Sequence, residues 1–318
     1  MNTENKSIFS KTPILILIAL ICCALWGSAT PAIKTGYNLL SVEGVPSIML
    51  FAGLRFALAG LFTVIIFSIA RRKILYPRLE NVPKVLTVSA FQTVIQYIFF
   101  YLGLALTTGV KGTVTSGSGA FFAVIIASLI FKQEKLTAKK IIACLIGFIG
   151  IVIINFNGLT LTDDPMDILG VVCVLLSTVS SSFSSVLIKR YSKDEDPVTI
   201  SGYQFIIGGI FMIIVGLIFG GNITVSEISG VLILVYLALL SAVAYGLWGI
   251  LLKYNPVSRV TVFNFTTPIF GTLLTILLLP GENSSLAPIN LAITLVLVSA
   301  GIFLLNYHPT SGSGGAKK

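Results

Sequence analysis

Ten runs of about 20 apolar residues follow one another along the chain, and each is long enough to cross the hydrocarbon core of a membrane as a helix. The runs cover residues 13–33, 46–70, 84–106, 111–131, 138–156, 168–189, 198–220, 229–252, 257–279 and 287–307. Turn formers and charges are confined to the short segments between them, such as RRKILYPRLENVPK at 71–84. The pattern predicts an all-α integral membrane protein with ten transmembrane helices and no separate soluble domain.

The composition supports a chain that is solvated by lipid. Of its 318 residues, 55% are hydrophobic and only 10% are charged, whereas a soluble domain has about 25% charged residues. The net charge of +9 could suggest a nucleic-acid partner. We exclude that class because the basic residues lie in short clusters between apolar runs, which is the pattern of membrane orientation. The lipid bilayer is therefore the expected partner.

The distribution of lysine and arginine predicts the orientation. If the N-terminus is cytoplasmic, only Lys34 and Lys111 of the 21 basic residues fall in outer segments and Arg55 falls within a run. The rest lie on the inner side, as the positive-inside rule requires. We expect a bacterial inner-membrane protein with both termini in the cytoplasm. The first apolar run is too long for a typical signal peptide and is expected to be retained.

The two halves of the chain resemble each other in the same order. The matched pairs are 52–60 with 201–209, 24–34 with 179–189, 96–105 with 244–253, 110–122 with 258–270, and 150–155 with 301–306. Because each half has five runs, the second copy must enter the membrane in the opposite direction. Inverted repeats are a transporter architecture with the substrate site near the midplane.

The repeat divides the chain into five parts. We expect a cytoplasmic tail at 1–11, a first five-helix repeat at 12–156, an outer linker at 157–167, a second repeat at 168–307 and a tail at 308–318. The last residues, TSGSGGAKK, read as a flexible end or an appended sequence.

Three motifs carry a resemblance to a known family. They are ALWGSATPAIK at 24–34, GLRFALAG at 53–60 and QEKLTAKKIIACLIGFIGIVII at 133–154, with looser copies LWGILLKYNP and PGENSSLAPIN in the second half. In this order the sequence resembles the EamA-type branch of the drug/metabolite transporter superfamily over about residues 12–307. One departure is Ala120, which stands where the second half has Pro268. A bend in the fourth run would then be softer or made by Gly117 and Gly119.

The resemblance implies a carrier of small metabolites, often an amino-acid or metabolite exporter, that works by alternating access without ATP hydrolysis. The chain agrees, since it contains no GxxxxGK[ST] motif and leaves no room for a nucleotide-binding domain. No ATPase domain, cofactor or metal is expected. The oligomeric state and the cargo are left open.

Polar and aromatic residues inside the runs are the candidates for substrate binding. Ser241, Tyr245 and Trp248 share a helix face, and their repeat partners Thr93, Tyr97 and Phe100 form the same stripe. The full candidate set is Trp26, Arg55, Gln96, Tyr97, Ser181, Gln204, Tyr245, Trp248 and Asn264. Helix packing and interhelical hydrogen bonding are the alternative roles, above all for the serine run at 177–185.

Arg55 is the cation deepest in the predicted bilayer. It lies about nine residues, or about 13 Å, from the outer end of its run, close to the middle of a core about 30 Å thick. Its repeat partner is Gln204, so this position is polar in both halves. Two roles remain open: a cation at the cavity edge held by neighbouring oxygens, or a direct ligand for a substrate carboxylate.

The acidic residues bear on coupling and on competing functions. None of the twelve acids lies within a predicted run, which disfavours a buried carboxylate that couples proton or sodium movement.

A lipid-modifying enzyme would need clustered catalytic groups, but the chain has one histidine, His308, and four cysteines within apolar runs. A channel is disfavoured because aromatic residues, and polar residues that form no rings, suit the binding of an organic solute rather than replacement of the hydration shell of an ion. An exchanger of nucleotide sugars or other anionic metabolites ranks behind a carrier of neutral or zwitterionic solutes because it would need several deep cations.

Overall fold

The computed structural model describes residues 8–107, 109–154, 164–278 and 288–306, and its regular secondary structure over these ranges is entirely helical. The α-helices are α1 Thr12–Leu39, α2 Gly44–Arg71, α3 Val82–Ser89, α4 Gln96–Leu106, α5 Gly109–Gly117, α6 Gly119–Ile125, α7 Ala138–Ile154, α8 Pro165–Tyr191, α9 Pro197–Ile218, α10 Ile228–Tyr254, α11 Val257–Thr261, α12 Thr267–Leu278 and α13 Pro288–Asn306. Shorter 3-10 or π segments are η1 Ile8–Ser10, η2 Leu79–Asn81, η3 Ala90–Ile95, η4 Ile126–Ile130 and η6 Val262–Thr266. The predicted all-α class is confirmed.

Eight helical segments of the described chain are long and apolar enough to cross a membrane. They are Thr12–Leu39, Gly44–Arg71, Leu79–Leu106, Lys111–Ile130, Pro165–Tyr191, Pro197–Ile218, Ile228–Tyr254 and Ile289–Asn306. The other two predicted runs contain α7, which has 17 residues, and the broken segment α11–η6–α12. A count of ten crossings therefore stays a prediction. The predicted linker 157–167 and the tails 1–11 and 308–318 fall largely outside the described residues.

The fourth and ninth runs are interrupted in different ways. In the fourth, α5 ends at Gly117 and α6 begins at Gly119, with Ser118 between them donating its hydroxyl to the Thr115 carbonyl oxygen. The break thus lies at Ser118, between the two glycines, and Ala120 is part of the helix that follows it. In the ninth, η6 leads into α12, and Pro268 occupies the first turn, where a missing N–H costs no helical bond. Gly119 beside the first break and Asn264 in the second line one and the same cavity, described below.

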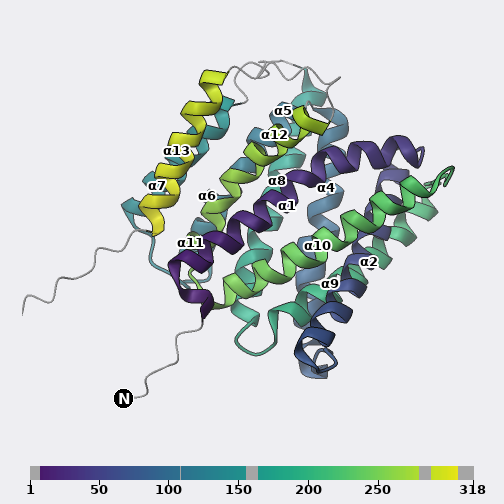
Figure 1. Cartoon of the computed structure of the whole chain (residues 1–318), viewed down its shortest axis with the longest axis horizontal. Helices are drawn as coiled ribbons and strands as arrows, with labels where there is room; N and C mark the ends of the chain where they lie inside the picture. Colours follow the sequence, from purple (N-terminus) through teal and green to yellow (C-terminus); the bar gives the residue numbers. More distant parts are fainter. Residues whose placement is uncertain (1–7, 108, 155–163, 279–287, 307–318) are drawn as a thin grey trace, which may run out of the picture.

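Helices at equivalent positions of the two halves pair with one another. The main packing partners are α2 with α9 and α7 with α13. The contact of α4 with α8 has its counterpart in that of α10 with α1, and α6 with α8 corresponds to α12 with α1. In Figure 1, α7 and α13 run side by side at one edge, and α2 lies along α9 at the opposite edge. Each contact thus has a counterpart in which every helix is replaced by its equivalent from the other half, as expected for two repeats.

Glycine makes the contact between α2 and α9 close. A Cβ atom placed on Gly209 would lie 2.4 Å from the Ala57 backbone nitrogen, and one on Gly53 would lie 2.6 Å from the Ile213 nitrogen. Gly60 and Gly202 continue the same seam, because a Cβ on Gly60 would lie 2.5 Å from the Gly202 carbonyl oxygen. In lipid there is little hydrophobic drive between helices, so such close backbone packing supplies much of the association energy.

We expect Gly209→Ala to lower the stability of the protein by about 1–3 kcal/mol, because the added methyl group meets backbone atoms that cannot rotate away. Gly112→Ala is the matched control, since its new Cβ would meet only the Leu104 side chain, at 3.3 Å and beyond. Thermal unfolding of both variants in detergent measures the difference. Equal melting temperatures for the two variants would contradict the proposed role of the α2–α9 contact.

Candidate substrate cavity

A cavity of about 280 Å³ lies between the two halves. Its walls come from both repeats: α1, α2, α4, α5 and α6 on one side and α8, α10, α11 and η6 on the other. The lining residues are Trp26, Ala29, Ile33, Arg55, Gln96, Tyr97, Phe100, Tyr101, Ser116, Gly119, Ala123, Ser177, Thr178, Ser181, Ser182, Ser185, Tyr245, Thr261 and Asn264. The lining is aromatic and polar, and it carries one formal charge, that of Arg55.

Arg55 is almost fully enclosed, with 3% of its surface exposed. Its Nε and Nη2 groups both donate hydrogen bonds to the Ser241 hydroxyl oxygen, at 3.2 and 3.0 Å. The guanidinium carbon lies 5.1 Å from the centre of the Phe56 ring. Within the described residues no carboxylate pairs with it. A buried cation is costly unless an opposite charge or several dipoles compensate it, so this group favours an anion in the cavity.

The repeat partner of Arg55 is held differently. Gln204 is fully buried and accepts a hydrogen bond from the Thr93 hydroxyl at 2.7 Å. Its amide nitrogen donates to the Gln92 side-chain oxygen at 3.0 Å. Since Thr93 is the repeat partner of Ser241, the same pair of positions is hydrogen-bonded in both halves. None of Gln204, Thr93 and Gln92 is among the residues that line the cavity.

Two tyrosines at equivalent positions meet at the cavity wall. The Tyr97 and Tyr245 hydroxyl oxygens are 3.1 Å apart, within hydrogen-bond distance. The Trp26 ring packs against Tyr245 at 5.0 Å and against Trp248 at 4.9 Å between ring centroids. Trp248 is only 3% exposed and lies behind Trp26. The aromatic wall is therefore two layers deep, and its inner layer positions the outer one.

Three polar atoms of the lining residues have no hydrogen-bond partner in the described part of the protein. They are the Trp26 indole nitrogen Nε1, the Gln96 oxygen Oε1 and the Asn264 oxygen Oδ1, all buried. A buried polar atom without a partner costs about 1–3 kcal/mol. One donor and two acceptors are thus available, together with the guanidinium group, to bind a solute in the cavity.

The serine run of α8 divides between two roles. Ser180 and Ser182 donate to the carbonyl oxygens of Phe91 and Gly119, at 2.6 and 2.9 Å, and so hold α8 to its neighbours. Ser181 lines the cavity, and Ser182 lines it too in addition to its bond to Gly119. One run thus serves both packing and the cavity.

Seven of the nine predicted site residues line this one cavity: Trp26, Arg55, Gln96, Tyr97, Ser181, Tyr245 and Asn264. Gln204 and Trp248 lie outside the lining, for the reasons given above. Among the residues that sequence reasoning did not select, Tyr101 is the most prominent. It is four residues from Tyr97 on α4, and this spacing was the signal that could have identified it.

The EamA-like transporter family model matches residues 13–156 and again 168–307. The chain belongs to this family. It is therefore an integral membrane transporter rather than an enzyme, and the two matched regions are the two repeats seen in the fold. The predicted family resemblance is confirmed.

This EamA-like transporter is similar to proteins from bacteria, archaea and plants. An Escherichia coli protein described as a probable amino-acid metabolite efflux pump is 24% identical over 91% of this chain and 93% of its own length. An uncharacterized transporter of Archaeoglobus fulgidus is 27% identical over 61% of this chain and 64% of its own length, so the match spans less than two thirds of that relative. A chloroplastic WAT1-related protein of Arabidopsis thaliana is 25% identical over 89% of this chain and 67% of its own.

A solved crystal structure has the same fold. It superposes with a TM-score of 0.76 and covers 93% of this chain and 97% of its own, at 19% sequence identity. At that identity the likeness concerns the arrangement of the helices only.

Two glutamines provide a matched test of the two polar environments. Gln204→Leu leaves the Thr93 hydroxyl and the Gln92 amide oxygen without their partner, and we expect it to lower stability by about 1–3 kcal/mol. Gln96→Leu removes an oxygen that has no partner among the described residues and should leave the melting temperature unchanged or higher. Thermal unfolding in detergent compares the two variants. A larger loss for Gln96→Leu would contradict this assignment.

Proposed function

We propose that this EamA-like transporter is a secondary carrier of small zwitterionic organic solutes, such as amino acids, and that it exports them by alternating access through the central cavity. The observation that carries the proposal is the buried Arg55 guanidinium, which lines the cavity without an acidic partner among the described residues. The Escherichia coli relative described as an efflux pump for amino-acid metabolites supports both the cargo class and the direction.

A carboxylate is the group that Arg55 is best placed to bind. Guanidinium presents five N–H donors in a planar fork, and among the described residues only Nε and Nη2 are engaged, both with the Ser241 oxygen. Hydrogen bonds between such a donor and an ionised carboxylate are about twice as strong as neutral ones. The same bond to Ser241 holds the guanidinium group in place, so the scaffold and ligand roles of Arg55 are compatible.

The opposite wall suits the ammonium group of a zwitterion. The side-chain oxygens of Gln96 and Asn264, which have no partner among the residues described, can accept its hydrogen bonds. The faces of Trp26 and Tyr97 attract a cation through their ring quadrupoles. A nucleotide sugar or a phosphorylated metabolite carries more negative charge than the single cation of this lining would neutralise, so an anion exchanger is the weaker alternative.

The ends of the cavity differ, which supports alternating access. On one side α8 closes onto α10: the Lys189 ammonium donates to the carbonyl oxygens of Leu252, at 3.0 Å, and Asn255. The Asn255 amide in turn donates to the Phe9 carbonyl oxygen at 3.0 Å. This end carries the basic loops, so by the predicted orientation it is the cytoplasmic mouth.

The equivalent helices of the other half, α1 and α4, make at most marginal contact over the described residues. Lys34 is the repeat partner of Lys189 and lies near the C-terminal end of α1. We propose that the opposite state of the carrier brings α1 onto α4 and releases α8 from α10. Because the two repeats have similar sequences, each can adopt the arrangement of the other with little difference in free energy, and inverted-repeat carriers alternate between two such states.

Arg55→Gln copies the repeat partner and removes the positive charge. We expect the variant to bind amino acids roughly ten- to hundredfold more weakly, because a charge-assisted hydrogen bond contributes about 1.5–3 kcal/mol. Its affinity for the corresponding decarboxylated amines should change little. A thermal-shift titration of the purified protein with both ligand series measures each affinity, because a bound ligand raises the melting temperature by mass action.

The stability of the ligand-free variant is the control in this experiment. Unchanged amino-acid affinity in a folded Arg55→Gln protein would contradict a role in carboxylate binding. A loss of folding would favour a purely structural role, and Arg55→Lys, which retains the charge, then tests binding separately.

The absence of Asp and Glu from the cavity lining leads to a prediction about coupling. We expect solute movement down its own gradient, with no acceleration by an imposed pH gradient, because the lining offers no carboxylate to carry the proton. Uptake into proteoliposomes with and without the gradient measures this. Uptake that is driven by the gradient and abolished by neutralising one loop acid would contradict the prediction.

A further inference from the structure

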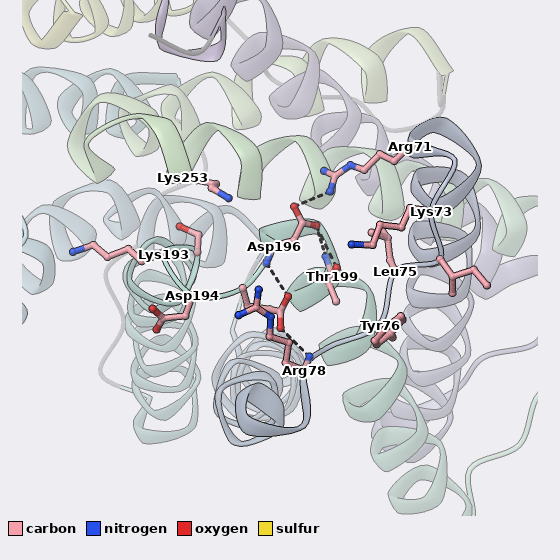
Figure 2. Close-up of a pocket in the computed structure, with 13 residues that line it drawn as sticks. Arg71, Lys73, Leu75, Tyr76, Arg78, Lys193, Asp194, Asp196, Thr199 and Lys253 are labelled. Carbon is pink, nitrogen blue, oxygen red and sulfur yellow. Dashed lines mark hydrogen bonds and ion pairs between the residues drawn. The ribbon is translucent and has the colours of Figure 1, made fainter. Parts of the chain in front are cut away.

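A second cavity, of about 440 Å³, lies outside the central one, at the end of the bundle that carries the basic loops. Three segments form it: the connection from α2 to α3, the turn from α8 to α9, and the end of α10 at Lys253. Figure 2 shows the charged side chains of these segments arranged around the turn that contains Asp196 and Thr199.

Two of the three acidic residues in this cavity are held by fixed partners. Arg71 Nη1 lies 2.7 Å from Asp196 Oδ1, and the other Asp196 oxygen accepts the Thr199 backbone N–H at 3.0 Å. One Glu195 oxygen accepts the Arg78 backbone N–H and the Asn81 amide, both at 3.0 Å. The bonds from Arg71, Arg78 and Asn81 join the first repeat to the second.

The third acid, Asp194, is also neutralised. Its Oδ2 accepts a hydrogen bond from the Lys84 ammonium at 2.6 Å. That hydrogen bond first, and then the positive charge of Lys84, hold the pKa of the Asp194 carboxyl below its usual value. The carboxylate is therefore ionised at neutral pH and paired with Lys84, and the positive charge of Lys193 acts on it in the same direction.

Three lysines of the same cavity make no ion pair within the described residues: Lys73, Lys193 and Lys253. In Figure 2 the ammonium groups of Lys73 and Lys253 point toward the Asp196–Thr199 turn from opposite sides, whereas Lys193 points away. Lys253 also lies 5.8 Å from the centre of the Tyr254 ring. The lysines and arginines that line the cavity outnumber its acids, so the cavity as a whole has an excess of positive charge, and the Asp196 carboxylate with its Arg71 partner lies between the two ammonium groups.

The surroundings of this cavity are apolar and exposed. Ile74 and Tyr76 line it with 74% and 66% of their surfaces exposed, and Leu79, on the same connection, is 90% exposed. Large apolar side chains beside unpaired lysines are unfavourable in water but suit the membrane interface, where tyrosine is enriched. A soluble anion would use the lysines alone, whereas a lipid would use both features.

We propose that this cavity binds the phosphate headgroup of an anionic phospholipid. Lys73 and Lys253 hold the phosphate from opposite sides, and the acyl chains lie along Ile74, Tyr76 and Leu79. Basic pockets of transmembrane bundles on this side are suited to such headgroups. The bound lipid would bridge the connections of the two repeats. This site is separate from the proposed solute cavity, and its test does not depend on transport.

The experiment uses the full chain in detergent, titrated with phosphatidylglycerol, phosphatidylcholine or glycerol phosphate and followed by native mass spectrometry and melting temperature. We expect phosphatidylglycerol to bind selectively and to raise the melting temperature. The double variant Lys73→Gln/Lys253→Gln should bind it at least about tenfold more weakly, since each basic residue near an anionic headgroup contributes about a fivefold factor. The Arg71–Asp196 and Lys84–Asp194 pairs remain, so the fold should be retained.

The matched control is Lys132→Gln/Lys135→Gln, which removes the same charge from exposed positions on the same predicted side, away from the cavity. It should bind phosphatidylglycerol as the unmodified protein does. Equal weakening by both double variants would overturn the site, because binding would then follow net charge alone. Equal affinity for phosphatidylcholine, or complete displacement of phosphatidylglycerol by glycerol phosphate, would overturn the assignment to an anionic lipid.

Discussion

The close contact between α2 and α9 is the constraint on which the central cavity depends. Gly53 and Gly60 on α2 meet Gly209 and Gly202 on α9, so the two backbones approach without intervening side chains. Equivalent helices of the two repeats thereby lie against each other. Arg55, which lies between the two α2 glycines, is then turned toward α10 and the cavity, where Ser241 holds it. Larger side chains at these glycine positions would push α2 and α9 apart and change the position of Arg55.

The function we propose comes from positions at which the repeats differ. Ser241 and Thr93 are equivalent and each bonds to the polar residue of the neighbouring helix, which is Arg55 in one half and Gln204 in the other. The glutamine is hydrogen-bonded within the protein, whereas in the part of the chain that the structure describes the arginine keeps unused donors and has no acidic partner. The scaffold is close to symmetric, and the proposed chemistry for recognising a zwitterion lies on one side of it.

The polar groups of this membrane protein fall into two classes. In lipid every buried donor or acceptor needs a partner inside the protein. Gln204, Thr93, Ser180 and Ser182 have such partners and hold helices together. Trp26, Gln96 and Asn264 each keep an atom without one among the described residues, and all three line the cavity. The same residue types thus indicate packing in one place and binding in another.

The sequence by itself determined the class of the protein. Apolar runs, basic loops and the internal repeat are properties of the chain that do not depend on packing, and they were sufficient for an all-α membrane transporter of two repeats. Helical spacing also predicted that Tyr245 and Trp248 share one stripe. The tertiary structure alone decided that Tyr245 reaches the cavity while Trp248 lies behind Trp26. It likewise decided that Gln204 is hydrogen-bonded to neighbouring side chains, whereas the Gln96 side-chain oxygen has no partner among the described residues. The period of a helix sets the direction of a side chain relative to its own axis, but whether that direction meets a hydrogen-bonding partner or a cavity depends on the neighbouring helices.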